Sequence, residues 1–345
     1  MGPSRHRSGE RYRLPQGRVP WAAVVVVLVL VAACGSAVAR APANPAPEAV
    51  GNELAAAGAG SLPQGTAGWQ VAWVTPSVHL TGLSVFDGTH AWVAASDGRI
   101  YAWDGTGWHV QQLDEDLGHM VAVDQRDAWV SSDDGIRHWD GKRWTLTGHD
   151  GVVTALAAAD ARHVWATDAT GIRTWSGTAW TRQYAATGMQ FRGITAADAS
   201  HAWAVGSNAD GSGVVVAWDG STWSVQATLP QPLSAVYASD ARHGWAVSPE
   251  GSIYTWDGTT WTQTADLHIV LADVTGTDAA HVWAVAASGE VLFRDGNGWA
   301  VQYQAPTTLS GIAALDAGHV WAIGFDTVYS TVPQGGTQGW SNSGL

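Results

Sequence analysis

Short segments in which hydrophobic and polar residues alternate make up most of the chain after residue 67. Within 233–264 there are four of them, LSAVYASD, HGWAVS, SIYTW and TWTQT. Each is rich in Val, Ile, Tyr, Trp or Thr and is bounded by Gly, Asp or Pro, which is typical of β-strands. The Asp-Gly pair of WDGTTW permits the positive φ that a tight hairpin needs. No segment has a convincing helical period, so the pattern predicts an all-β protein.

This four-segment unit recurs seven times, and each copy has an aspartate five residues before a tryptophan. The leading tryptophans, 36 to 42 residues apart, are Trp92, Trp129, Trp165, Trp203, Trp245, Trp283 and Trp321. Four strands (a to d) per unit, with a period near 38 residues, are typical of a β-propeller blade. We therefore predict a seven-bladed β-propeller of four-stranded antiparallel blades over residues 67–345.

The two ends of the repeat region suggest how the ring closes. The segment GWQVAW (68–73) resembles a strand d that has no blade of its own. The seventh copy has an irregular c–d turn, VPQGGTQGW. Pairing the early strand with this last blade would leave no exposed sheet edge, so we predict that strand to close the ring.

The aspartate and histidine of the repeat have a structural explanation. The aspartate can accept backbone N–H groups within the a–b turn, and a histidine three residues later can brace the same turn. The histidines in question are His90, His163, His201, His243, His281 and His319. The second copy has Asp127 in the histidine position, so the pattern survives the substitution.

Paired tryptophans across the c–d hairpins allow two interpretations. The pairs are 103/108, 139/144, 175/180, 218/223 and 256/261. They can fill the gaps between blades, which we favour, or present exposed faces for stacking on sugar rings, as in a lectin. Their exposure to solvent distinguishes the two.

The N-terminus has the pattern of an export signal followed by a tether. Five arginines precede an uncharged run that ends at Cys34, the single cysteine, and Val31-Ala32-Ala33-Cys34 resembles a bacterial lipobox with a lipidated cysteine. Two alternatives are an uncleaved membrane helix over 19–39 and cleavage after Ala37-Val38-Ala39. We favour residues 1–34 as a lipoprotein-type signal peptide or membrane anchor and 35–66, rich in Ala, Pro and Gly, as a disordered linker. All three possibilities place the propeller outside the cytoplasm.

Charge and motif content narrow the function. A net charge of −13 without a basic stripe argues against nucleic acid as a partner. No GxSxG, HExxH or Walker motif occurs, and we expect no enzyme activity, no cofactor and no metal site. Asp114-Glu115-Asp116 and Asp133-Asp134 could bind calcium, although such acidic clusters are usually just solvated.

The repeats resemble those of bacterial secreted propellers in the broad Asp-box (BNR) and YVTN/WD-repeat-like superfamily, and also tectonin-type repeats. Asp104 and Trp108 are four residues apart, whereas an Asp-box has five steps. Sialidases of this fold need an arginine triad and a Tyr–Glu pair, but Glu250 and Glu290 are the only glutamates after Glu115. The resemblance therefore implies the fold far more than a function, and the missing glutamates and arginines argue against a sialidase.

Differences between the copies suggest a candidate ligand site. The b–c and d–a connections, which vary in length, lie on one face of a propeller, and variable loops on a rigid scaffold commonly bind ligands. Larger or polar residues near this face interrupt a pattern of mostly small ones on the innermost strands, and the longest b–c insertion adds two more polar residues. The candidates are His119, Arg192, Asn208, Asp210, Tyr237 and Asp273. Alternatively, Arg192 and Asp273 pair with each other and plug the channel.

These observations favour a non-catalytic, extracytoplasmic, membrane-tethered propeller that acts as a scaffold at the cell surface. Its partner would be an unidentified protein or glycan, and we expect a monomer. A carbohydrate-binding propeller is the alternative, and a glycan-active hydrolase or lyase is a weaker one.

Overall fold

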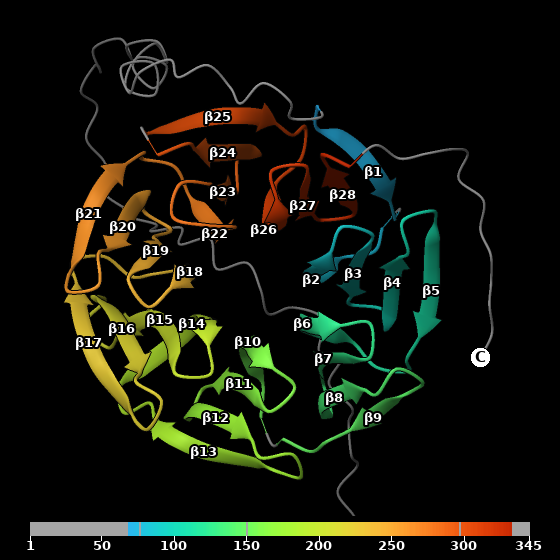
Figure 1. Ribbon diagram of the computed structural model, residues 1–345, viewed down its shortest axis with the longest axis horizontal. Coiled ribbons are helices and arrows are strands. Elements are labelled where there is room, and N and C mark those ends of the chain that lie inside the picture. Colours follow the sequence, from blue (N-terminus) through green and yellow to red (C-terminus); the bar gives the residue numbers. More distant parts are fainter. Residues whose placement is uncertain (1–67, 76, 150, 297, 333–345) are drawn as a thin grey trace, which may run out of the picture. The chain divides into compact units, whose positions relative to one another are not determined.

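The computed structural model describes residues 68–75, 77–149, 151–296 and 298–332. These residues form 28 β-strands in seven four-stranded antiparallel sheets, which surround a central axis like the blades of a propeller (Figure 1). The predicted seven-bladed fold is confirmed. Within these ranges no helix is long and apolar enough to cross a bilayer. The proposed signal or anchor (1–34), Cys34 and the linker (35–66) lie outside the described residues.

The first six blades each consist of four consecutive strands. The first blade comprises β2 (Leu80–Asp87), β3 (His90–Ala95), β4 (Arg99–Trp103) and β5 (Trp108–Gln112). The second comprises β6 (Leu117–Asp124), β7 (Asp127–Ser132), β8 (Gly135–Trp139) and β9 (Trp144–Leu146). The third comprises β10 (Val153–Asp160), β11 (His163–Asp168), β12 (Gly171–Trp175) and β13 (Trp180–Ala185).

The remaining blades continue the series around the ring. The fourth comprises β14 (Met189–Asp198), β15 (His201–Asn208), β16 (Gly213–Trp218) and β17 (Trp223–Leu229). The fifth comprises β18 (Ala235–Asp240), β19 (His243–Val247), β20 (Ser252–Trp256) and β21 (Trp261–Asp266). The sixth comprises β22 (Leu271–Gly276), β23 (Val282–Ala286), β24 (Glu290–Arg294) and β25 (Trp299–Gln304). The seventh comprises β26 (Leu309–Asp316), β27 (His319–Gly324), β28 (Thr327–Ser330) and β1 (Gln70–Val74).

The N-terminal strand closes the ring. β1 pairs antiparallel with β28 and so supplies the outermost strand of the seventh blade, as predicted. Just before β1, Trp69 stacks on Tyr303 of the sixth blade at 5.8 Å, and its Nε1 donates a hydrogen bond to Gln302 at 2.9 Å. Trp73 is buried at 4% exposure. The segment with the irregular c–d turn continues past residue 332, outside the described residues.

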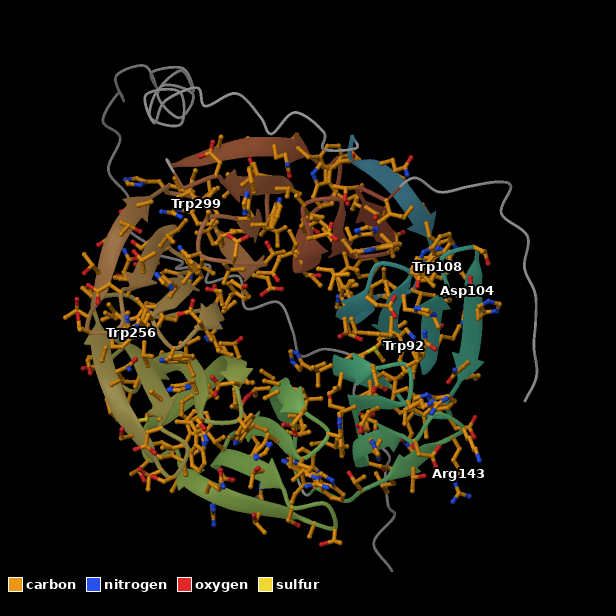
Figure 2. The ribbon with its side chains drawn as sticks, viewed as in Figure 1. Trp92, Asp104, Trp108, Arg143, Trp256 and Trp299 are labelled. Carbon is orange, nitrogen blue, oxygen red and sulfur yellow. The ribbon has the colours of Figure 1, made fainter. Side chains whose placement is uncertain are left out.

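Tryptophans join neighbouring blades. The indole of Trp165 on β11 contacts Trp218 and Trp223 of the fourth blade, with ring centroids 6.4 and 6.3 Å apart. Trp92, Trp129 and Trp321 contact the hairpin pair of the following blade in the same way. Trp92 and Trp256 accordingly lie in the wall of the ring and not in the channel (Figure 2). The gap-filling interpretation of the paired tryptophans is therefore confirmed at these interfaces.

The repeated aspartate and histidine brace the a–b turns. Asp160 accepts hydrogen bonds from the backbone N–H groups of Arg162 and His163 at 2.7 and 3.0 Å, and from the His163 ring at 2.9 Å. Burial alone would raise the pKa of Asp160, but these hydrogen bonds lower it. In the second blade, where Asp127 has the histidine position, Asp124 accepts the backbone N–H of Arg126 at 2.6 Å and His138 on β8 donates from Nε2 to Asp127 at 2.8 Å. The structural explanation of this motif is confirmed.

Candidate functional site

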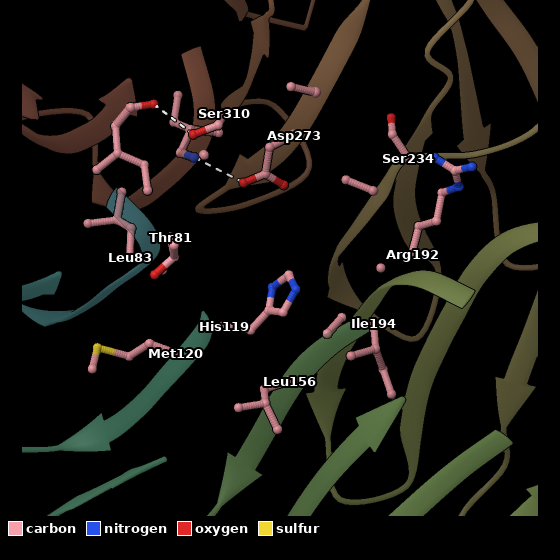
Figure 3. Close-up of a pocket in the computed structure, with 18 of the residues that line it drawn as sticks. Thr81, Leu83, His119, Met120, Leu156, Arg192, Ile194, Ser234, Asp273 and Ser310 are labelled. Carbon is pink, nitrogen blue, oxygen red and sulfur yellow. Dashed lines mark hydrogen bonds between the residues drawn. The ribbon is translucent and has the colours of Figure 1, made fainter. Parts of the chain in front are cut away.

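A cavity of about 250 Å³ lies in the central channel and is lined by residues of all seven innermost strands (Figure 3). On β2, for example, the lining residues are Thr81, Gly82 and Leu83, which follow the first residue of the strand. The innermost strands all begin where a d–a connection ends. The cavity is therefore closer to the face that carries the d–a and b–c connections, hereafter the variable face.

Three ionisable residues line this cavity, and all three were predicted from the sequence. They are His119 on β6, Arg192 on β14 and Asp273 on β22, so they come from the second, fourth and sixth blades. Figure 3 shows the His119 ring projecting into the cavity, whereas the Arg192 side chain is directed away from it toward Ser234. The rest of the lining consists of small, hydroxyl-bearing or aliphatic residues. The ionisable groups of the lining are thus confined to three side chains, and Thr81, Ser234 and Ser310 add hydroxyls.

Arg192 is exposed and, within the described ranges, has neither an ion pair nor a side-chain hydrogen bond. Other arginines toward this face are paired: Arg99 with Asp97 at 2.8 Å, Arg137 with Glu115, and Arg173 with Asp168 at 2.7 Å. The alternative in which Arg192 and Asp273 form an ion pair that plugs the channel is not observed. The guanidinium remains available to an external group.

Asp273 is held by the backbone of two blades. Its Oδ1 accepts the N–H of Val274 at 2.8 Å, and its Oδ2 accepts the N–H of Ile312 on β26 at 3.0 Å. Burial raises the pKa of Asp273 to about 6, against the lowering effect of these two hydrogen bonds. One oxygen thus bonds within the sixth blade and the other joins the sixth blade to the seventh, so both accept backbone N–H groups.

His119 and Thr81 add uncharged polar groups to the same cavity. Water reaches the His119 ring through the channel, yet protein atoms surround it closely, and this desolvation lowers its pKa. The neutral imidazole therefore predominates at neutral pH. The Thr81 hydroxyl is shielded from solvent and has no hydrogen-bond partner among the described residues. Thr81 was not among the candidates, because these were chosen for differences between the seven repeats and other blades also have Thr or Ser in that position.

Tyr237 does not line the cavity, and its prediction as a channel residue is wrong. Its ring stacks on Trp245 at 6.0 Å and packs with the core between the fifth and sixth blades. A Cβ atom on Gly276 would lie 2.6 Å from the Tyr237 ring, so the tyrosine occupies space that a glycine leaves. Its side chain points toward the neighbouring blade and not toward the axis. The other blades have Ala or Val where the sixth has Gly276. This difference in the sequence could have indicated that the Tyr237 ring packs against the sixth blade.

Asn208 and Asp210 are also absent from the cavity lining. Asn208 donates from Nδ2 to the Ser212 hydroxyl at 2.9 Å. Asp210 accepts the backbone N–H and the hydroxyl of Ser212 at 2.9 and 2.6 Å. Both side chains therefore stabilise the turn between β15 and β16, so of the six predicted residues the structure gathers three in the cavity.

The hairpin tryptophans offer little surface for a sugar. Each member of the five pairs is buried or half-buried. A second hollow, of about 270 Å³, lies between the fourth and fifth blades, where the small residues Ala217 and Ser224 stand beside Trp203. However, Trp203 is only 3% exposed and Trp256 only 9%. Stacking on a sugar ring needs a broad exposed indole face, which neither residue provides.

The acidic clusters considered for calcium do not form a metal site in the part of the chain that the structure describes. Glu115 pairs with Arg137. The pKa of Asp116 is raised by burial and by the neighbouring carboxylates of Asp133 and Asp97. No group of three or more His, Cys, Asp or Glu side chains within the described ranges is arranged to hold a metal ion.

Comparison with known proteins identifies the fold but not a family. No protein-family model and no curated protein matches the chain. A solved structure described as YCF48 bound to D1 peptide matches with 17% identity and a TM-score of 0.63, over 77% of this chain and 97% of that one. YCF48 from Cyanidioschyzon merolae matches with 16% identity and a TM-score of 0.61, over 78% and 100%. These similarities support the β-propeller fold, whereas the finer resemblance to Asp-box and tectonin-type repeats stays a prediction.

Proposed function

We propose that this chain is a non-catalytic binding propeller that is held outside the cytoplasm by a lipid on Cys34 and recognises another protein with its variable face. The observation that carries the proposal is the Arg192 guanidinium, which is exposed beside the channel cavity and has no ion pair or side-chain hydrogen bond among the described residues. An exposed guanidinium without an internal partner is available to pair with a carboxylate of another protein, and arginine is enriched in protein interfaces.

Exposed apolar side chains on the variable face support a protein as the partner. Val152 and Val270 lie in the connections that lead into β10 and β22, with exposed fractions of 82% and 52%. Phe325, in the connection between β27 and β28, is 52% exposed and stacks on His79. Apolar and aromatic groups around a charged anchor are typical of a protein-binding surface.

The repeated tryptophans and aspartates are used to hold the fold together, which leaves the residues that differ between blades for binding. The tryptophans are used in contacts between blades, and the turn aspartates are used in hydrogen bonds within each turn. The similar fold of YCF48 is described as bound to a D1 peptide, so a ring of this architecture can receive a peptide. A protein segment is therefore preferred here to a glycan.

Replacing Val152 and Phe325 together with serine should greatly reduce capture of the protein partner, because it removes two exposed apolar contacts from the variable face. The measurement is chemical cross-linking in intact cells that produce the full chain, followed by mapping of the cross-linked peptides. Val225→Ser with Val301→Ser is the matched control, since these valines are 49% and 40% exposed on the outer strands β17 and β25. Equal loss in both double variants, or loss in neither, would contradict the proposal.

Cys34→Ser should move the protein from the membrane fraction to the medium or leave it as an unprocessed precursor, because the lipid attachment point is gone. Fractionation and intact mass measurement of the full chain would show which occurs. Retention of the variant in the membrane at full precursor mass would instead favour the uncleaved helix over 19–39.

A further inference from the structure

The channel cavity contains a negative charge that no side chain of the described residues neutralises. Asp273 is the single carboxylate among the residues that line the cavity, and Figure 3 shows its carboxylate directed into that space. The side chain is partly exposed to the channel and otherwise enclosed by protein atoms, and no cationic side chain contributes to its electrostatic environment. Enclosed charges in proteins are ordinarily paired, so this one is a candidate for an external cation.

The backbone bonds of Asp273 hold its carboxylate in place and leave part of it free. Its Oδ1 accepts the N–H of Val274, and its Oδ2 accepts the N–H of Ile312. A carboxylate has about four lone-pair positions, so about two remain for another donor. Next to Oδ2, blade seven has Gly311, where even a Cβ atom would lie 3.8 Å from this oxygen. The missing side chain leaves space beside the carboxylate.

We propose that the channel cavity binds an organic ammonium group, with the Asp273 carboxylate as its counter-ion. The inference rests on the proposed function in taking the variable face as the binding face. An ammonium group combines a positive charge with N–H donors, and its charge-assisted bond to a carboxylate is stronger than a neutral hydrogen bond. One donor bonds to Asp273, and the others can bond to water, for which a cavity of about 250 Å³ has room.

The uncharged polar groups of the lining can accept hydrogen bonds as well. The hydroxyls of Ser234 and Ser310 donate to backbone carbonyl groups at 2.8 and 3.4 Å, so their oxygen lone pairs remain for a donor. The Thr81 hydroxyl has no hydrogen-bond partner among the described residues. The neutral His119 ring has one nitrogen that accepts. A group rich in donors therefore meets acceptors in this cavity, whereas an anion meets the charge of Asp273.

The charges around the cavity favour an ammonium over other ions. Arg192 is the single lysine or arginine in the lining, and Figure 3 shows it directed toward Ser234 and away from the cavity. The net charge of −13 attracts cations. A metal ion needs several ligands, and the described ranges contain no group of three His, Cys, Asp or Glu side chains arranged for one. A lysine side chain, a chain N-terminus and a small free amine all supply an ammonium group.

The test is ligand-observed saturation-transfer NMR on the purified full chain at pH 7.5. The probes are Nα-acetyl-lysine amide, trialanine amide with a free N-terminus, propylammonium and the uncharged N-acetyl-trialanine amide. We expect the acetylated peptide to bind at least about tenfold more weakly than the peptide with a free N-terminus. Asp273→Asn should weaken binding of the charged probes by about tenfold or more. Asp114→Asn is the matched control, since it removes the same charge from an exposed connection outside the lining.

A pH titration of the unsubstituted protein gives a second measurement, in case Asp273→Asn disturbs the contact between blades. Burial raises the pKa of Asp273 to about 6, so its carboxylate is charged at pH 7.5 and becomes protonated as the pH falls through 6. Binding of the lysine probe, which stays charged throughout, should therefore decrease about tenfold between pH 7.5 and pH 5. His119→Gln should retain this decrease, because the titrating group is Asp273 and not the imidazole.

Binding that changes less than twofold in folded Asp273→Asn protein would overturn the proposal, as would equal binding of the acetylated peptide or no change between pH 7.5 and pH 5. Displacement of the lysine probe by potassium chloride at constant ionic strength would make the cavity an alkali-cation site and overturn the ammonium. The tightest of the charged probes identifies the source of the group.

The outcome is separable from that of the proposed function. If no ammonium probe binds but capture of the partner still depends on Val152 and Phe325, the ammonium inference fails and protein binding stands. If the probes bind at Asp273 but no cross-linked partner depends on the variable face, the ammonium site stands and the proposed function fails.

Discussion

Trp165→Ala is expected to lower the free energy of unfolding by about 3–5 kcal/mol, the range for truncating a large buried aromatic side chain. Trp165 is 1% exposed and lies between the third and fourth blades, against Trp218 and Trp223. Its Nε1 has no hydrogen-bond partner among the described residues, so the loss comes from packing rather than from a broken hydrogen bond. Urea unfolding followed by circular dichroism measures the change.

A substitution on the surface provides the comparison for Trp165. Val152→Ala, at a side chain that is 82% exposed, should change the free energy of unfolding by less than about 0.5 kcal/mol. Trp165→Phe, which retains part of the ring contact, should fall between the two. A loss below about 1 kcal/mol for Trp165→Ala would mean that the interface between these blades does not depend on the indole.

Deleting residues 68–75 is expected to lower the melting temperature by more than about 10 °C, because the closing strand and two large aromatic contacts are lost together. Trp73 is 4% exposed, and Trp69 bonds to Gln302 of the sixth blade. The deletion also leaves β28 as an unpaired edge, which promotes aggregation. Differential scanning calorimetry and size-exclusion chromatography measure the two effects.

Conservative changes on the same strand serve as the control for this deletion. Val71→Thr and Val74→Thr alter side chains that are 49% and 43% exposed, and should leave the melting temperature within about 2 °C. If the deleted protein melted like the original, another segment would have to complete the seventh blade, and the closure by β1 would be wrong.

The sequence by itself determined the blades, the closing strand and the roles of the repeated residues. The hydrogen-bond partners of the turn aspartate lie within three residues of it, as for Asp160 with Arg162 and His163. The role of the motif could therefore be predicted from the local sequence alone. Strand order within a blade follows from short hairpins, which bring consecutive segments together. Because the chain has seven copies of one unit and an extra strand d at the start, that extra strand is expected to complete the seventh blade, as β1 does.

Only the tertiary structure decided which candidate site residues meet. Tyr237 stands on an innermost strand as predicted, but its direction depends on the space left by Gly276 in the next blade. Asp273 is bound by Ile312 across a blade boundary, a contact with no local signal in the sequence. Likewise, the sequence does not show that Arg192 and Asp273, which line the same cavity, form no ion pair with each other. The sequence could name the residues of the channel, whereas packing between blades determined which of them face one another.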